Sequence, residues 1–251
     1  YVVNGQAPSG HEYAEQGDGS FVCEACGWKR IELSDCSISL PYENYTYTGG
    51  ERRPYPVVVA PDGTRLEGGS VDFYVNWKNN VDVGWGTAVV TARSGYLVNL
   101  TEYRGDYGGS VEVRFKIRPP RPSGLEVAER EPTALKLVWQ GSEATDYYQI
   151  YRSSDEGASW KKVAETSERS CVVDELEPDA AYQFKVRAYT AVDDEKFYSL
   201  AYSDVVGART AALPSEDDYT LALSRSVYTY NGAERMPEVA VFTSDGQALA
   251  A

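Results

Sequence analysis

Alternation of apolar and polar residues along short runs predicts most of the secondary structure of this chain. Two runs show it, each with four apolar residues on one face: Val71, Phe73, Val75 and Trp77, and later Val111, Val113, Phe115 and Ile117. A period of two residues with one apolar face is typical of half-buried β-strands. Turn residues separate the runs, and no stretch of ten or more residues has helical spacing. We therefore expect an all-β fold in which the strands pack as β-sandwiches.

A repeated segment indicates that the chain consists of modules joined in series. Residues 45–66 match residues 228–249 without a gap, and 11 of these 22 positions are identical. A repeat whose copies enclose a different segment is typical of modular proteins. We expect residues 36–118 to form a complete module and residues 216–251 to form the first half of a second one, truncated at Ala251. Opening strands alone would expose unpaired edges, so we also expect packing on the preceding domain or on another chain to complete this half-module.

The first module resembles a known family. The pattern Tyr-Thr-Tyr-x-Gly starting at Tyr45, the pair Asp62-Gly63, the run Asp72-Phe73-Tyr74-Val75 and the closing run at 111–117 are similar to Ig-like modules of bacterial surface proteins. The resemblance implies a β-sandwich within a large secreted or wall-attached protein of Gram-positive bacteria. Trp85, which stands between two glycines, and the insertion at 96–102 depart from the usual pattern of that module.

A proline-rich segment at 119–122 separates this module from the next, and because proline fixes φ we expect a stiff hinge there. Beyond it, Leu135, Leu137 and Trp139 alternate as one strand, while Tyr148 and Ile150 mark another. The segment 176–188 then places Tyr182 ahead of a strand with alternating apolar residues.

Residues 119–212 resemble a fibronectin type III domain in these features. The resemblance implies a sandwich with Trp139 in its core and a tyrosine corner, in which the phenol of Tyr182 bonds to upstream backbone. It also implies that Tyr202-Ser203-Asp204 opens the last strand. Pro214 and the acidic residues 216–218 form a short linker to the half-module.

A Cys/His segment at 1–35, with Cys36 directly after it, is the strongest candidate metal site. His11, Cys23 and Cys26 supply three of the four ligands that a tetrahedral zinc ion needs, and the fourth is either Cys36 or a residue upstream of Tyr1. A single Cys-x-x-Cys without a second pair is a weak motif. We therefore keep two readings: a structural zinc ion, or a local disulfide or free thiols in a loop. No open coordination position with a general base is indicated, so a catalytic zinc is not expected.

Two further motifs have structural readings that we favour. Cys171 stands where the type III pattern has an inward apolar residue, and a lone buried cysteine behaves as a small hydrophobe. Arg104-Gly105-Asp106 is the tripeptide that integrins recognise, but its glycine and the following Tyr107-x-Gly109 match the turn before the last strand of the Ig-like family. We read that segment first as a turn.

Composition narrows the partners. Asp and Glu number 38 against 24 Lys and Arg, giving a net charge of −14, so nucleic acid and anionic membrane are poor partners. The sequence has no window of 18 apolar residues, so no membrane-spanning segment is predicted. With one histidine and no nucleophile–base set, we expect no catalysis and no cofactor besides the candidate zinc.

Aromatic residues are the remaining candidates for ligand contact, because flat rings bind sugars or proteins. The candidates are Tyr42, Tyr45, Tyr47, Tyr55, Trp77, Trp85 and Tyr96 in the first module, and Trp160, Tyr189, Phe197 and Tyr198 in the second. We favour the alternative that they are cross-strand partners.

We expect a non-catalytic structural or adhesive fragment of an extracellular or wall-attached bacterial protein, with a protein or glycan ligand and contacts to neighbouring modules. The alternative is a set of accessory binding modules attached to a secreted glycan-degrading enzyme.

Overall fold

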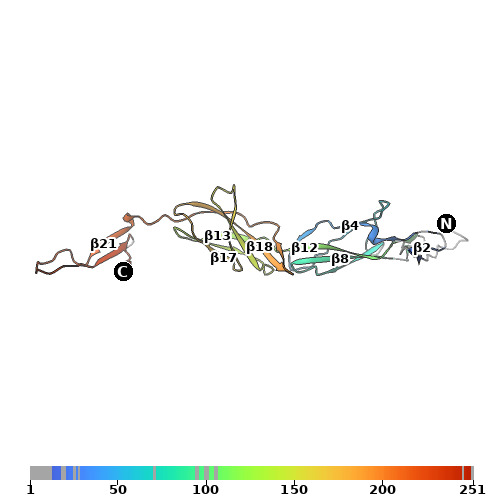
Figure 1. Ribbon diagram of the computed structural model, residues 1–251, viewed down its shortest axis with the longest axis horizontal. Coiled ribbons are helices and arrows are strands. Elements are labelled where there is room, and N and C mark those ends of the chain that lie inside the picture. The colour runs from blue at the N-terminus through green and yellow to red at the C-terminus, as the bar shows by residue number, and fades with distance from the viewer. Residues whose placement is uncertain are drawn as a thin grey trace.

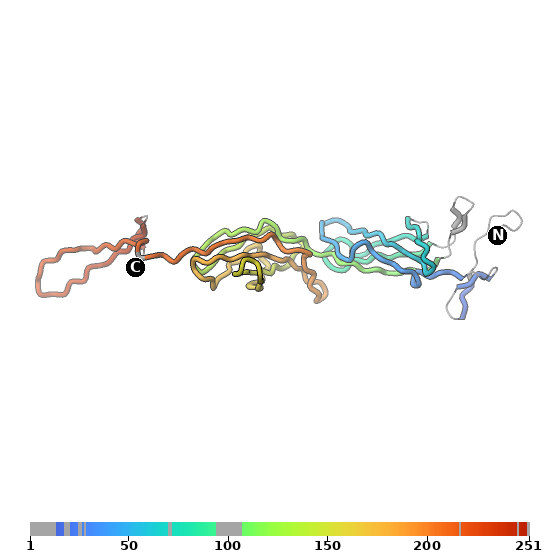
Figure 2. Tube along the Cα trace, turned by 90° about the horizontal axis from the view of Figure 1, so that it is seen from above, coloured from blue at the N-terminus to red at the C-terminus, as the bar shows by residue number. Residues whose placement is uncertain are grey.

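The computed structural model describes residues 13–17, 21–24, 27, 29–69, 72–93, 96–98, 102–104, 107–244 and 246–249. These residues form a row of β-structures along one long axis (Figures 1 and 2). Within them, the only helical turns are the short 3-10 segments η1 (Leu33–Asp35) and η2 (Glu216–Asp218). The predicted all-β fold is therefore confirmed.

The described residues of the N-terminal segment include a small hairpin next to the first sandwich. Strand β1 (Tyr13–Glu15) pairs with β2 (Phe21–Cys23), and β3 (Ile31–Glu32) pairs in parallel with β11 (Tyr107–Gly108). This parallel pairing joins residues 31–32 to β11, which directly precedes the last strand of the first sandwich.

The first sandwich contains a four-stranded sheet in the order β5 (Asn44–Thr46), β12 (Ser110–Arg118), β8 (Gly84–Ala92) and β7 (Phe73–Lys78). A second pair, β4 (Ser37–Ser39) and β6 (Val57–Val59), packs against it. A further hairpin joins β9 (Tyr96–Val98) to β10 (Glu102–Arg104). The resemblance of this first sandwich, residues 36–118, to Ig-like modules stays a prediction.

The core of this sandwich follows the predicted alternation. Phe73 is buried while Tyr74, its neighbour in β7, is exposed. Phe73 and Val90 face Val58 and Leu66 across the two layers in one buried cluster. Removing a side chain of this size from water contributes about 1.5–3 kcal/mol, so these alternating residues account for the layering.

The second sandwich occupies residues 123–209. Strands β13 (Ser123–Arg130), β14 (Leu135–Gln140) and β17 (Ser170–Val173) form one sheet. The other contains β16 (Lys161–Thr166), β15 (Tyr147–Ser153), β18 (Ala181–Val192) and β19 (Glu195–Tyr198), with β20 (Val206–Arg209) also on β18. The predicted strands around Leu135 and Tyr148 are confirmed, and Trp139 lies in the core.

Two local predictions for this sandwich have different outcomes. The tyrosine corner is present, because the backbone N–H of Glu177 donates to the Tyr182 hydroxyl at 3.0 Å. The predicted start of the last strand at Tyr202-Ser203-Asp204 is wrong, since β20 begins at Val206. The Val186 N–H donates to the Ser203 hydroxyl at 2.9 Å, and the Ser203 N–H donates to the Val186 carbonyl at 2.8 Å. The Ser203 hydroxyl thus replaces a backbone carbonyl as the acceptor for β18, just before the regular pairing of β18 with β20 begins.

The C-terminal repeat folds as a hairpin of β21 (Tyr219–Leu223) and β22 (Val239–Thr243). Thr220 pairs with Phe242 as Ser37 pairs with Val59 in the first copy, so both strands keep the sequence offset (220 − 37 = 242 − 59 = 183). The hairpin lies beyond the second sandwich at the end of an extended connection (Figures 1 and 2). Of the alternatives expected for its completion, packing on the preceding domain is therefore not seen for the described residues.

Candidate functional site

The joint between the two sandwiches is a built interface. The indole N–H of Trp85, in β8, donates to one oxygen of Glu195 in β19 at 2.8 Å. The ammonium group of Lys116, in β12, lies 2.7 Å from the other oxygen. The ring of Phe197 meets Trp85 edge to face, with 6.2 Å between centroids. One carboxylate and one aromatic pair thus hold the two domains together.

Charge reinforces this contact. Hydrogen bonds from Lys116 and Trp85 lower the pKa of the Glu195 carboxyl. Lys116 Nζ also lies 4.5 Å from the Trp85 ring centroid, within cation–π range. Glu195 is therefore ionised at neutral pH and bonded to a partner on both of its oxygens.

A second set of contacts lies at Arg118. Its Nε donates to Asn44 Oδ1 at 2.6 Å within the first sandwich, and its Nη1 donates to the Tyr198 carbonyl in the second at 3.2 Å. Burial, and then the charge of Arg187, lower the pKa of Arg118. Because guanidinium stays charged in proteins, this residue acts as a fixed bridge.

The proline segment 119–122 runs between these contacts. Pro119 and Pro122 are buried, and Arg121 forms an ion pair of 3.0 Å with Asp204. The predicted hinge is thus flanked by side-chain contacts between the domains. Sequence reasoning missed this joint, although Trp85 between two glycines was the signal that could have pointed to it.

Tyrosines line the outer face of the β15–β18–β19 sheet beside the joint. Tyr189 is the register partner of both Tyr147 and Tyr198, and the ring centroids are 5.2 and 5.3 Å apart. Tyr189 is only 3% exposed and Phe197 only 1%. The idea that these two are exposed ligand-binding rings is wrong, because neighbouring strands and the first sandwich cover them. The cross-strand reading fits this face.

Glu165, in β16, organises the polar groups of the same face. It accepts hydrogen bonds from the Tyr189 hydroxyl at 2.6 Å and from Gln149 Nε2 at 2.9 Å. These two bonds lower the pKa of Glu165 to about 2. Burial, followed by the bond to Glu165, raises the pKa of Tyr189. The tyrosine therefore stays a neutral donor to a charged acceptor.

Cation–π contacts extend this face toward β20. Arg187 lies 4.8 Å from the Tyr198 ring centroid and 5.2 Å from that of Tyr202. Lys185 lies 4.4 Å from Tyr202 and 4.0 Å from Trp160. These cation–π contacts stabilise the side chains on this face, which explains why so many aromatic residues occur outside the core.

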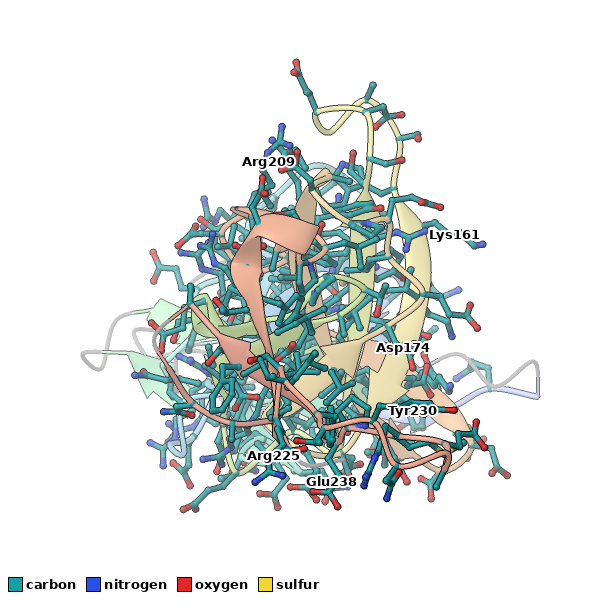
Figure 3. The ribbon with its side chains drawn as sticks, turned by 90° about the vertical axis from the view of Figure 1, so that its left-hand side faces the viewer. Lys161, Asp174, Arg209, Arg225, Tyr230 and Glu238 are labelled. Carbon is teal, nitrogen blue, oxygen red and sulfur yellow. The ribbon has the colours of Figure 1, made fainter. Side chains whose placement is uncertain are left out.

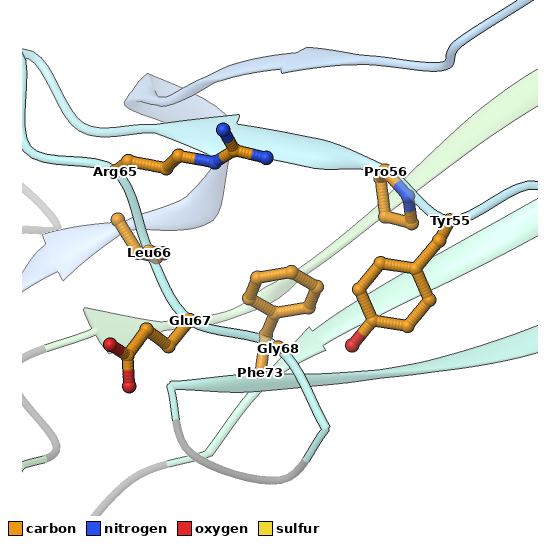
Figure 4. Close-up of a pocket in the computed structure, with 7 residues that line it drawn as sticks. All are labelled: Tyr55, Pro56, Arg65, Leu66, Glu67, Gly68 and Phe73. Atoms are coloured by element: carbon orange, nitrogen blue, oxygen red, sulfur yellow. The ribbon is translucent and has the colours of Figure 1, made fainter.

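An open groove lies at the edge of the first sandwich (Figure 4). It has a volume of about 590 Å³ and is lined by Tyr55, Pro56, Arg65, Leu66, Glu67, Gly68 and Phe73. Tyr55 is 44% exposed and its ring centroid lies 6.0 Å from that of Phe73. In the repeat, Glu238 and Ala248 stand at the positions of Tyr55 and Arg65 (offset 183). The aromatic ring and the guanidinium group of the groove therefore belong to the first copy alone.

The candidate zinc ligands are only partly described. His11 and Cys26 lie outside the described residues. Cys23 is buried in β2, and Cys36 follows η1, where its thiol lies 3.6 Å from the Glu32 carbonyl. Burial, and then Asp35, raise the pKa of Cys36. No cluster of three metal-ligating side chains occurs within the described part of the chain. The zinc site stays a prediction.

The other two motifs are placed differently. Cys171 lies in β17 and packs against the core of the second sandwich, and burial raises the pKa of its thiol. This agrees with its reading as a small hydrophobe. Arg104 ends β10, whereas Gly105 and Asp106 lie outside the described residues, so the integrin reading stays untested.

Comparison with known proteins identifies the second sandwich. The family model for the fibronectin type III domain matches residues 119–203. Interference hedgehog of Drosophila mojavensis is 26% identical over 138 residues, which cover 52% of this chain and 15% of that protein. The chain therefore spans a small part of that relative.

Solved structures also match part of the chain. The fibronectin type III domain of human fibronectin type III domain containing protein 3 is 23% identical, with coverage of 39% of this chain and 94% of that one and a TM-score of 0.33. A family 28 exopolygalacturonase of Yersinia enterocolitica is 22% identical, with coverages of 38% and 21% and a TM-score of 0.31. Within the described residues, no helix is long and apolar enough to cross a lipid bilayer. The matched residues 119–203 fold into the second sandwich and carry its tyrosine corner, so the chain contains a fibronectin type III domain at these residues.

Proposed function

We propose that the two sandwiches form a non-catalytic rigid spacer in a multi-domain protein of the bacterial surface or a secreted one. The observation that supports this is the joint, where Trp85, Lys116 and Arg118 of one sandwich contact Glu195, Phe197 and Tyr198 of the other. A flexible tether would need no such contacts. Fibronectin type III modules are common in extracellular interaction proteins, and the motif of residues 36–118 resembles bacterial surface modules.

The spacer role requires that the two sandwiches tumble as one body. Backbone ¹⁵N relaxation of the 251-residue chain measures a rotational correlation time separately for residues 36–118 and 123–209. We expect one common value. In Trp85→Ala/Lys116→Ala the Glu195 carboxylate loses both partners, and we expect two shorter, unequal values.

The matched control is Lys78→Ala. Lys78 forms an exposed ion pair of 3.0 Å with Glu112 on the first sandwich and takes no part in the joint contacts. It should leave the common correlation time unchanged. Separate correlation times in the unmodified chain would contradict the proposal.

A second candidate function, carbohydrate binding as an accessory module of a glycan-degrading enzyme, is favoured by the groove in Figure 4. A half-exposed Tyr55 beside Arg65 and Glu67 combines a ring face with hydrogen-bonding groups, which suits a sugar. Glycan-array binding that disappears in Tyr55→Ala would support it. Absence of binding to any glycan would leave the spacer as the sole proposal.

A further inference from the structure

The C-terminal hairpin has an uncovered apolar face. Alternate residues of β21 and β22 point to one side: Tyr219, Leu221, Leu223, Val239, Val241 and Thr243. Leu221 is 69% exposed, Val239 56% and Leu249 48%. Figure 3 looks onto this end of the molecule, where Arg225, Tyr230 and Glu238 mark the chain between the two strands. Apolar surface gathered on one side of a hairpin is typical of an interaction site.

The first copy shows what covers such a face. There Ile38, Val58 and Leu66 occupy the equivalent positions (38, 58 and 66 plus 183 give 221, 241 and 249), and Val58 and Leu66 are 0% and 4% exposed. Their cover consists of alternate residues from three strands: Phe73 and Val75 in β7, Val90 and Ala92 in β8, and Val111 in β12. One antiparallel sheet thus buries Val58 and Leu66 and packs against the half-buried Ile38.

The two copies agree in detail beyond the two strands. The N–H of Leu66 donates to the Val58 carbonyl at 3.0 Å, and Leu249 donates to Val241 in the same way at 2.9 Å. The guanidinium of Arg52 donates to the Thr46 carbonyl, and that of Arg235 donates to Thr229. The second hairpin has therefore taken up the geometry of a covered hairpin while its own face is bare.

Backbone carbonyls that accept hydrogen bonds from the covering sheet have equivalents in the second copy. In the first copy, the Asn80 amide donates to the Arg52 carbonyl at 3.1 Å, and the Trp77 indole donates to the Pro54 carbonyl at 3.1 Å. The equivalents Arg235 and Pro237 are present in the second copy.

The edge that the covering sheet would pair with is open as well. Residues 44–46 pair in parallel with β12, whereas the equivalent residues 227–229 belong to no strand. The second copy thus offers both a face and an edge of the shape that β12 fills in the first.

We propose that this hairpin is a docking surface for a partner segment that forms a three-stranded antiparallel sheet of the same kind as residues 73–118. The segment presents apolar residues at alternate positions to Leu221, Val241 and Leu249, and its last strand pairs in parallel with residues 227–229. Among the described residues, such a sheet occurs once, and it packs on the first hairpin. The described part of a second copy of the chain therefore offers no further sheet of this kind. The proposal is independent of the spacer function.

The test uses the full ¹⁵N-labelled chain and, as probe, a separate polypeptide comprising residues 69–121. At a free probe concentration about ten times the Kd, the amides of β21 and β22 should gain about tenfold protection from hydrogen exchange. A probe carrying Phe73→Asp should give no protection, and this comparison leaves the labelled chain unaltered.

Two variants of the chain locate the face. Leu221→Asp lies on the apolar side and should abolish the protection, whereas Thr220→Asp, on the opposite side of the same strand, should retain it. Amide shifts of the unbound variants report whether the hairpin itself persists. Equal binding of the Phe73→Asp probe, no protection by either probe, or concentration-dependent dimerisation through Leu221 without any probe would each overturn the proposal.

Discussion

At the residue scale, a single carboxylate controls much of the polar network of the type III domain. Glu165 has a pKa of about 2 against an ordinary value of 4.5, because Tyr189 and Gln149 donate to it. Since the pKa is lowered in the folded protein, the stabilisation is fully present above the ordinary pKa. It is lost as the pH falls from about 4.5 toward 2.

Glu165→Gln should therefore lower the free energy of unfolding at pH 7 and reduce its dependence on pH in that acid window. The side chain is 31% exposed, so solvent screening limits the loss to about 1 kcal/mol. Urea denaturation at a series of pH values measures it, and Glu168→Gln, in the turn after β16, is the matched control. An unchanged acid slope in Glu165→Gln would count against this role.

The Tyr182 hydroxyl has a role of similar size. Tyr182→Phe removes the acceptor for the Glu177 N–H while keeping the ring, so a partly buried donor loses its partner. We expect a loss of about 1–3 kcal/mol in unfolding free energy, measured by denaturant titration. A ring-only role for Tyr182 would instead leave the stability of Tyr182→Phe equal to that of the unmodified chain.

At the scale of elements, alternation was sufficient to predict β7, β12, β14 and β15. A strand with one buried face has apolar residues at every second position, and this period is visible in the sequence. Parallel pairing of β5 with β12 was not predictable in this way, since it joins residues far apart in the chain. The joint was missed for the same reason: Trp85 and Glu195 are 110 residues apart. The burial of Tyr189 and Phe197, two of the candidates for ligand contact, comes from neighbouring elements and was likewise not predictable from a local pattern.

One element-scale prediction concerns the tight approach of β8 to β12. Gly86 pairs with Phe115, and a Cβ at Gly86 would lie 2.4 Å from that ring. Gly86→Ala should thus displace a fully buried side chain and cost about 1–3 kcal/mol in the stability of the first sandwich. Gly50→Ala, where the nearest atom is 3.9 Å away, should leave the melting temperature nearly unchanged. Equal melting temperatures for both variants would show that the core yields easily.

At the scale of the whole molecule, the relative placement of the two sandwiches depends on an ionisable group. Glu195 bonds to Lys116 and Trp85 across the joint, and these bonds lower its pKa. A lowered pKa means that the contact is intact above the ordinary carboxyl range and is lost as the pH falls through the lowered value. The domains themselves need not unfold for this to happen, because each has its own buried core.

We therefore expect solution scattering to show one rigid, elongated particle at pH 7 and a broader range of domain orientations in acid. The near-ultraviolet circular dichroism of the same samples tests that both sandwiches remain folded. Glu195→Gln should behave at pH 7 as the unmodified chain does in acid, because its neutral amide no longer attracts the Lys116 ammonium. If Glu195→Gln stays as rigid as the unmodified chain at every pH, then the Trp85–Phe197 contact and the Arg118 bridge alone hold the joint. In that case Trp85→Ala, and not acid, should release it.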